Sequence, residues 1–331
     1  MQRRKHYKTY KFPKVESNAV LYRFVCVLVI AAVIAITVSG IVIGRSLSDD
    51  PQKISQPPQD VEELPKYYSG FGAMTEVSKE NSQIDYGDLI LVNYQYPCVY
   101  EEPQLTAMLE NSAYNYTVAD YDVKINTSVF DYADKLLGDF ETQNGGSSDI
   151  LVACAYRSRQ LQTELYNDKL EADGKEEADK WIAKPGYSEH QSGYSMDLSV
   201  MIDGVTYDYD GAGDEKWIND NCYKYGFIVR YPEDRSETTK IEHEPWHFRY
   251  VGVPHAEYIF KNNLCFEDYI ELLHGKTAEQ PLVIDSESGK YAVYYCAKDA
   301  LSQSTAVPVP SSLEYTVSGD NIGGFIVTVK L

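Results

Sequence analysis

Residues 193–200 read Gly-Tyr-Ser-Met-Asp-Leu-Ser-Val, and they alternate apolar and polar side chains more cleanly than any other stretch of the sequence. A period of two is typical of a β-strand that buries one face, because successive side chains point to opposite sides of a sheet. The tyrosine, methionine, leucine and valine of this stretch then face the core. Asp197 lies on the opposite face, where a carboxylate can take part in a site.

Helices and further strands surround this segment along the chain. Residues 128–140 place apolar side chains at helical spacing, and Asn144-Gly145-Gly146 follows as a stop signal. We predict further helices over 159–170, 214–225 and 254–273, and strands over 89–92, 150–155, 227–230 and 247–251. The mixture predicts an α+β fold, with a compact domain over 81–275 in which helices flank a small, largely antiparallel sheet.

The N-terminal part of the chain differs from the rest. Residues 1–45 carry eight Lys or Arg residues against one acidic residue, although the formal net charge of the whole chain is −20. Residues 24–44 contain no charged side chain and are long enough to cross a bilayer as a helix. A cleaved signal peptide is the alternative, but its apolar core would be shorter. We expect a short basic cytoplasmic tail at 1–23, a transmembrane anchor at 24–44 and an extracytoplasmic linker at 45–80, with the N-terminus inside.

The remaining composition narrows the classes of partner. An acidic extracytoplasmic domain repels polyanions, so we expect no nucleic acid as a partner. Residues 276–331 contain β-rich segments at 291–296 and 325–329 and no cluster of titratable groups, so we predict a small C-terminal β appendage without chemistry of its own. The five cysteines outside the anchor are as consistent with buried apolar side chains as with disulfides.

A second polar stretch, His243-Glu244-Pro245-Trp246-His247, contains the residue types of a metal site. It matches the His-Glu-x-x-His pattern, in which two histidines one helical turn apart bind zinc beside a glutamate base. However, Pro245 disfavours a helix interior, and the aromatic and β-branched residues that follow favour a strand. We therefore do not expect His243 to be a ligand, and the helical zinc-protease interpretation stays as an alternative.

His190 and Asp197 upstream, together with Glu244 and His247, supply two imidazoles and two carboxylates. Three such ligands around zinc leave a fourth position for water, and the remaining carboxylate can act as a base beside it. The functional interpretation therefore depends on whether these two distant stretches meet in the fold.

Several motifs in a fixed order carry a resemblance to a known family. In chain order they are Tyr156-Arg157-Ser158 with Gln162, Ser188-x-His190-x-x-Gly193-x-x-x-Asp197, and Glu244-Pro-Trp-His247. Together they resemble the zinc D-alanyl-D-alanine carboxypeptidases related to VanY, the M15 peptidases, over about Asp85 to His274. The resemblance implies a compact α+β domain, which agrees with the pattern of helices and strands predicted above.

The resemblance also implies a role for each matching residue. Arg157 would bind the terminal carboxylate of the substrate, assisted by Gln162 and Ser188. The implied partners are a peptidoglycan stem peptide ending in D-Ala and, through the anchor, the lipid bilayer. The implied ligands of Zn²⁺ are His190, Asp197 and His247, and the implied general base is Glu244.

We expect a membrane-anchored zinc carboxypeptidase that removes the terminal D-alanine from stem peptides outside the cytoplasm. Alternatives on the same site are L,D-carboxypeptidase, D,D-dipeptidase and endopeptidase activities, which depend on the depth of the pocket. A non-catalytic wall-binding module with a structural metal is a further alternative. Glu244 argues against it, because a structural site has no use for an unliganded carboxylate.

Overall fold

The structure is a computed structural model that describes residues 67–100, 102–114, 116–145 and 149–331. The predicted cytoplasmic tail, the anchor and most of the linker lie outside these residues. In the described ranges, no helix combines the length and the hydrophobicity needed to cross a bilayer. The predicted linker is too long at its C-terminal end, because strand β1, Met74–Glu80, pairs with a strand of the folded part.

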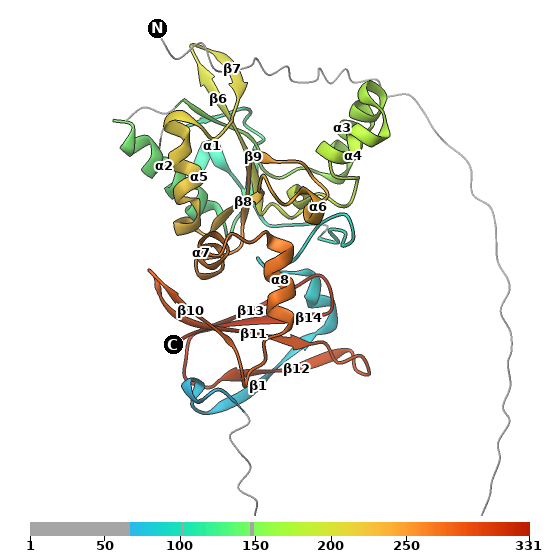
Figure 1. The fold of residues 1–331 in the computed structure, drawn as a ribbon, viewed down its shortest axis with the longest axis vertical. Helices are drawn as coiled ribbons and strands as arrows, with labels where there is room; N and C mark the ends of the chain where they lie inside the picture. The colour runs from blue at the N-terminus through green and yellow to red at the C-terminus, as the bar shows by residue number, and fades with distance from the viewer. Residues whose placement is uncertain (1–66, 101, 115, 146–148) are drawn as a thin grey trace, which may run out of the picture. The chain divides into compact units, whose positions relative to one another are not determined.

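A six-stranded sheet contains the segment at 193–200 (Figure 1). Its strands run in the order β3-β5-β6-β9-β8, and β7 pairs with the C-terminal half of β6. Neighbouring strands are antiparallel except for β3 and β5, which confirms the largely antiparallel character that we predicted. The bounds are β3 Thr117–Val118, β5 Ile150–Cys154, β6 Ser195–Ile202, β7 Val205–Asp208, β8 Phe227–Tyr231 and β9 Glu244–Tyr250.

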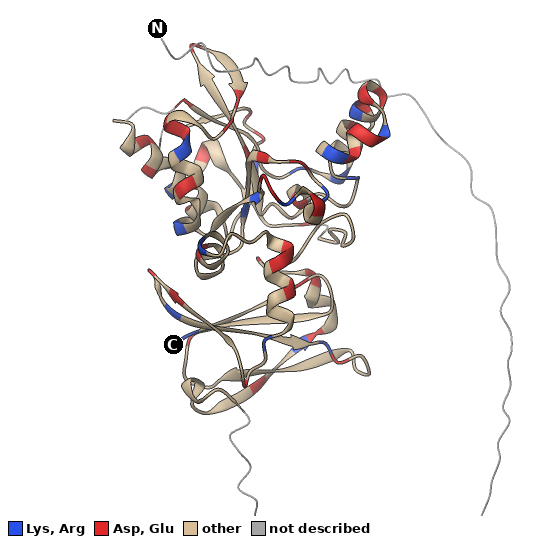
Figure 2. Ribbon diagram, viewed as in Figure 1, with Lys and Arg blue, Asp and Glu red and all other residues tan. Residues whose placement is uncertain are grey.

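The apolar faces of β6 and of helix α2 belong to one core cluster. Met196 and Leu198 are buried in the same core cluster as Leu136 and Leu137, so both predicted periodicities are confirmed. Along α3 and α4, acidic and basic residues interleave (Figure 2), and some of them form ion pairs one helical turn apart. The bounds are α2 Phe130–Gln143, α3 Arg159–Asp173, α4 Lys175–Trp181, α5 Lys216–Asn221 and α7 Val253–Lys261.

The C-terminal strands form a second sheet with the order β10-β11-β14-β13, and β12 pairs with β1. Helix α8 joins the two sheets, because its Tyr269 shares a core cluster with Ile228 of β8 and with Val293 of β11. The predicted β strands are confirmed, but the region is packed into the main fold and is not an appendage. The bounds are α8 Phe266–His274, β10 Leu282–Ser286, β11 Gly289–Ala297, β12 Ser304–Pro310, β13 Tyr315–Gly319 and β14 Gly324–Lys330.

Residues 89–92 are buried but do not form the strand that we predicted. Their backbone bonds to the C-terminal region: the Leu89 amide donates to Ser318 Oγ, and the Leu91 amide donates to the carbonyl oxygen of Asp320, each at 3.0 Å. These bonds satisfy two buried backbone amides without a strand ladder. The remaining short strands and α-helices of the described ranges are β2 Leu105–Ala107, α1 Met108–Asn111, β4 Lys124–Asn126 and α6 Ser236–Thr239.

Candidate metal centre

Two strands of the central sheet bring Asp197 and His247 together. Strands β6 and β9 are antiparallel, and their register pairs these two residues directly. Both side chains point away from the core, because their chain neighbours Met196 and Phe248 are fully buried in the core cluster. Asp197 Oδ1 lies 2.8 Å from His247 Nδ1. The alternation within 193–200 therefore places a carboxylate where a second strand supplies an imidazole.

The strand at His247 contradicts the helical zinc-protease alternative. Residues 244–250 form β9, so His243 and His247 do not lie one helical turn apart on a helix. His243 Nδ1 lies instead 2.8 Å from the carbonyl oxygen of Tyr231. His243 is therefore engaged with the backbone of the neighbouring strand.

His190 reaches the same point from a short helix. The 3-10 helix Glu189–Ser192 ends at Gly193, whose positive φ of 74° lets the chain turn directly into β6. A side chain there would crowd Asn126, since an added Cβ would lie 3.0 Å from its backbone nitrogen. His190 Nε2 then lies 3.1 Å from Asp197 Oδ2. The His190 ring stands nearly perpendicular to the second imidazole, with centroids 4.8 Å apart.

The hydrogen bond at Nδ1 of His190 leaves the other ring nitrogen, Nε2, for a metal. His190 Nδ1 lies 2.6 Å from the carbonyl oxygen of Ala155, which can only accept. Nδ1 therefore carries a proton, and Nε2, which faces Asp197, is the nitrogen that would bind a metal once it is deprotonated. Burial alone would raise the pKa of Asp197, but the two imidazoles hold that pKa well below its ordinary value. Two nitrogens and a carboxylate that converge in this way fit Zn²⁺.

Glu244 stands beside this cluster at the start of β9. Its side chain is buried, and its Oε2 lies 3.8 Å from His247 Nδ1. Burial raises the pKa of Glu244 to about 7, although the nearby imidazole of His247 opposes the shift. A carboxyl group with a pKa near neutrality can both accept and return a proton at physiological pH, as a general base that later acts as an acid must do.

Arg157 connects the predicted substrate-binding residues to the cluster. Its Nη2 lies 3.3 Å from Asp197 Oδ2, and its Nη1 donates to Gln162 Oε1 at 3.0 Å. Gln162 in turn donates through Nε2 to the carbonyl oxygen of Ala183 at 2.7 Å. Ser188 is buried directly before the short helix of the site, and within the described ranges its hydroxyl makes no hydrogen bond to Arg157 or Gln162. The structure thus links two of these three residues directly.

Comparison with known proteins shows the family to which this chain belongs. Residues 123–253 match the family model of VanY, D-alanyl-D-alanine carboxypeptidase. A D-alanyl-D-alanine carboxypeptidase of Enterococcus faecium is 31% identical over 280 residues, which cover 82% of this chain and 86% of the relative. One of Enterococcus faecalis is 30% identical over 285 residues, which cover 80% of this chain and 94% of the relative. The chain belongs to the VanY family.

A solved structure extends the likeness to the VanY family in three dimensions. The vancomycin resistance D,D-dipeptidase VanXYg, in complex with a D-Ala-D-Ala phosphinate analogue, matches with a TM-score of 0.68 and 28% sequence identity. The match covers 78% of this chain and 100% of that one, so it is not confined to residues 123–253. As a member of the VanY family, the chain is a peptidase.

Cys154 lies in this VanY-family site as a free cysteine, although the sequence left it open between a buried apolar residue and a disulfide partner. Its Sγ and donor atoms of His190 and Asp197 all lie within 4.8 Å of one another. However, the sulfur is on the Nδ1 side of the His190 ring, 4.0 Å from the nitrogen that bonds a carbonyl. It also accepts a hydrogen bond from Arg157 at 3.4 Å. We therefore favour His247 over Cys154 as the third ligand and regard the thiol as a support for Arg157.

A buried ion network that the motifs did not reveal lies behind His247. Glu189 is fully buried, and its Oε1 accepts hydrogen bonds from Arg230 at 2.9 Å and Arg249 at 2.7 Å. Its Oε2 lies 3.7 Å from His247 Nε2, which has no hydrogen-bond partner among the described residues. Burial would raise the pKa of Glu189, but the two guanidinium groups lower it, so the carboxylate is ionised. A metal on Nδ1 would leave the proton on Nε2, facing this carboxylate.

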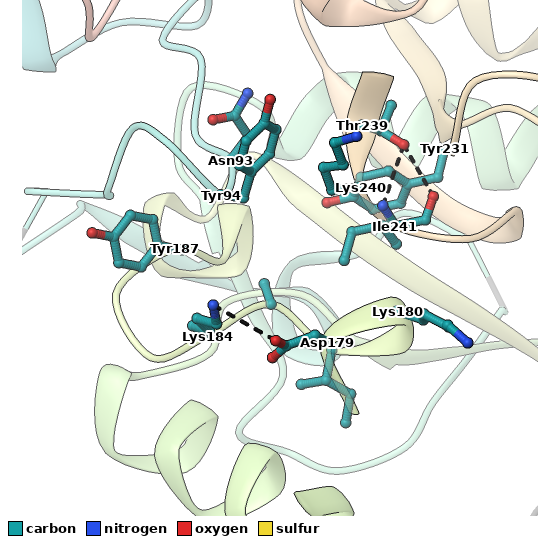
Figure 3. Close-up of a pocket in the computed structure, with 12 residues that line it drawn as sticks. Asn93, Tyr94, Asp179, Lys180, Lys184, Tyr187, Tyr231, Thr239, Lys240 and Ile241 are labelled. Atoms are coloured by element: carbon teal, nitrogen blue, oxygen red, sulfur yellow. Dashed lines mark hydrogen bonds and ion pairs between the residues drawn. The ribbon is translucent and has the colours of Figure 1, made fainter. Parts of the chain in front are cut away.

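A cavity of about 320 Å³ adjoins the site (Figure 3). Tyr231 forms part of its wall, and the ring centroid of Tyr231 lies 5.1 Å from that of His247. Ala183, whose carbonyl oxygen holds Gln162, lines the cavity as well. Figure 3 shows Tyr187 on the opposite side of the cavity from Tyr231. Two residues of the cavity wall therefore contact a predicted metal ligand and a predicted substrate-binding residue, neither of which lines the cavity itself.

Proposed function

We propose that this VanY-family peptidase is a zinc-dependent D-alanyl-D-alanine carboxypeptidase that removes the terminal D-alanine from peptidoglycan stem peptides. The observation that carries the proposal is the convergence of His190, Asp197 and His247, with Glu244 beside them. The two enterococcal relatives support the substrate class, because both bear the name D-alanyl-D-alanine carboxypeptidase and match this chain over most of their lengths.

The residues of the site divide the reaction between them. His190 Nε2, Asp197 and His247 Nδ1 would hold Zn²⁺, which when bound lowers the pKa of a water molecule to about 7 and polarises a peptide carbonyl. Glu244 takes a proton from the attacking water as the water oxygen bonds to the carbonyl carbon. The same carboxyl group returns this proton to the amide nitrogen as the carbon–nitrogen bond breaks. The products are free D-alanine and the shortened peptide.

Arg157 is suited to the free carboxylate at the end of the substrate. A guanidinium group presents two parallel N–H groups that match the two oxygens of a carboxylate. Its bonds to Gln162 and Asp197 hold it at the site, and the hydroxyl of Ser188 is the third predicted contact. Recognition of a chain end in this way distinguishes an exopeptidase from an enzyme that cuts within a chain.

We also propose that the enzyme is anchored at the outer face of the cell membrane. The support is the uncharged stretch 24–44, which follows a basic N-terminal segment. A polar linker over 45–66 would then separate the catalytic domain from the bilayer. Fractionation of cells tests this proposal: the full chain should sediment with membranes, and a chain without 24–44 should not.

A D,D-dipeptidase is the second candidate function. The observation that favours it is the likeness to VanXYg over the whole of that protein, whose name is D,D-dipeptidase. The two activities differ in the substrate that the site accepts. A dipeptidase acts on free D-Ala-D-Ala, whereas a carboxypeptidase requires room for a longer stem peptide ahead of the cleaved bond.

Defined substrates separate these candidates. Purified zinc-loaded protein is incubated with a pentapeptide ending in D-Ala-D-Ala, with the corresponding tetrapeptide and with free D-Ala-D-Ala, and the products are resolved by mass. A D,D-carboxypeptidase yields the tetrapeptide, an L,D-carboxypeptidase yields a tripeptide, and a dipeptidase cleaves the free dipeptide fastest. Absence of cleavage of all three would favour the non-catalytic wall-binding module.

A substitution tests the role of Glu244. Glu244→Gln should lower kcat about 10²–10⁴-fold, the range expected when a general acid–base group is lost, while bound zinc remains. Glu242→Gln is the matched control, because it removes a carboxylate two residues away and should change neither quantity. Unchanged hydrolysis by Glu244→Gln would refute this assignment of the base.

A further inference from the structure

A second cavity, of about 490 Å³, shares Tyr187 with the cavity of Figure 3. Its wall includes residues that neighbour the proposed site along the chain, since Tyr156 precedes Arg157 and Gln191 follows His190. The second recess therefore lies beside the chain segments that carry Arg157 and His190, and none of the roles above uses it.

Arg159 lines this second cavity and differs from the other arginines that the structure describes. Arg157, Arg230, Arg235 and Arg249 each lie within ion-pair distance of a carboxylate. In the same described ranges, the guanidinium of Arg159 has neither an ion pair nor a hydrogen bond. Carboxylates are abundant in this chain, whose formal net charge is −20. A guanidinium that pairs with none of them is available to an anion from outside the protein.

Arg159 is exposed, and its side chain forms part of the cavity wall. Arg159 is the first residue of α3, and the N-cap Ser158 accepts a hydrogen bond from the Leu161 amide at 3.2 Å. The guanidinium lies against Gly186, where an added Cβ would be 3.3 Å from Nη2. Gly186 has a positive φ of 91°, so the backbone also favours glycine at this point.

Gln191 provides a second unpartnered group in the same cavity. The residue is only 7% exposed, and within the described ranges its Oε1 is buried without a hydrogen-bond partner. A buried amide oxygen without a partner is unfavourable, so this group is suited to a ligand. A peptide group offers both an N–H donor and a carbonyl acceptor, and it would satisfy the carboxamide in either orientation.

We propose that this cavity binds a residue of the peptide substrate that bears a free internal carboxylate. The carboxylate pairs with Arg159, the peptide group of the same residue bonds Gln191, and the rings of Tyr156 and Tyr187 line the recess. This inference rests on the proposed carboxypeptidase function, and it adds a preference for acidic stem peptides. The positive N-terminal end of α3 adds to the attraction for an anion.

Matched pairs of pentapeptides test the proposal. Every peptide ends in D-Ala-D-Ala. In each pair, one peptide carries a carboxylate on an internal residue and the other carries a carboxamide at the same residue. A separate pair is made for each internal residue. At one position the wild type should show a kcat/KM about tenfold higher for the carboxylate, equivalent to about 1.4 kcal/mol. The difference should lie in KM, because the ion pair is made equally in the ground and transition states.

Variants of α3 locate the effect. Arg159→Gln should lower kcat/KM for the carboxylate peptide to the level of the carboxamide peptide and leave the carboxamide peptide unchanged. Lys169→Gln is the control, because it removes a charge near the other end of the same helix, where Lys169 pairs with Asp173 at 2.6 Å. This control should keep the full preference of the wild type.

Two results would overturn the proposal: equal activity of the wild type on both members of every pair, or an equal loss on both members in Arg159→Gln. If no peptide is cleaved, the proposed function fails. The binding of the paired peptides then tests the proposed subsite separately. Isothermal titration of Glu244→Gln protein with the paired peptides should show about a tenfold difference in Kd that the added Arg159→Gln change removes. Equal Kd values would reject the subsite.

Discussion

The buried carboxylate of Glu189 should affect the proposed metal centre although Glu189 is not itself a proposed ligand. Glu189→Gln keeps the size of the side chain and removes its charge. Arg230 and Arg249, both fully buried, would then lose a charged acceptor that now lies at 2.9 and 2.7 Å. Removal of one partner from a buried ion network costs about 3–5 kcal/mol, so we expect the free energy of unfolding to fall by about that amount.

The same substitution should weaken zinc binding. The carboxylate of Glu189 lies 3.7 Å from the Nε2 of His247. At an effective dielectric constant of 20, its negative charge would attract a unit positive charge at that nitrogen by roughly 4 kcal/mol. The two guanidinium groups that share the carboxylate of Glu189 offset most of this attraction. We expect about 1.4 kcal/mol to remain, which is a tenfold loss of affinity and the lower end of the range for removal of a carboxylate behind a metal-bound histidine.

Glu267→Gln separates the loss of stability from the loss of metal affinity. Glu267 also accepts from Arg230, at 2.9 and 2.7 Å, but no contact joins it to His247 in the described structure. Both variants should lower the urea midpoint of unfolding. Only Glu189→Gln should raise the Kd for zinc, measured by competition with a chromophoric chelator at a temperature where both variants are folded. Equal zinc affinity in the two variants would refute the argument that this carboxylate acts through His247.

Three further outcomes are expected. His247→Ala should lose bound zinc and His243→Ala should retain it, measured as metal content after dialysis, because His243 bonds a backbone carbonyl; zinc loss in both would contradict the exclusion of His243 from the metal centre. Burial lowers the pKa of His255 to about 3, against ~6.5 in an unfolded chain, so its contribution to stability is complete above pH 6.5 and is lost as the pH falls toward 3. Between pH 7 and 5, the free energy of unfolding from urea titrations should fall about 2 kcal/mol more in the wild type than in His255→Gln, and equal slopes would contradict this. A chain that ends at residue 275 should show no cooperative thermal unfolding, because Tyr269 packs against strands that the truncation removes.

Periodicity predicted the elements that carry the site, because each of them buries one face. The alternation at 193–200 corresponds to β6, and the helical spacing at 128–140 corresponds to α2. Pro245 and the aromatic residues after it correctly indicated a strand and not a helix. The order of the motifs pointed to Asp197 and His247. The register of β6 and β9 brings these two side chains within hydrogen-bond distance.

Long-range partners left no such local signal. The strand Met74–Glu80 pairs with residues more than 200 positions away, and its own sequence is polar enough to resemble a linker. Arg230 and Arg249 occupy strand positions, and a strand pattern cannot show that both guanidinium groups are buried on one carboxylate. The available signal was that a fully buried arginine requires an acidic partner, but burial itself is a property of the assembled fold.

The support of the metal centre continues into the C-terminal sheet. Arg230 is held by Glu267 of α8, and α8 packs against the strands of that sheet. The guanidinium of Arg249 donates to the carbonyl oxygen of Ile90 at 2.9 Å, and the next residue, Leu91, bonds to the loop between β13 and β14. Both arginines that bond the carboxylate behind His247, a proposed metal ligand, are thus anchored in contacts with the C-terminal region. Because a metal site requires its ligands to be held within about 0.5 Å of their working positions, residues 276–331 contribute to the site without supplying any of its reactive groups.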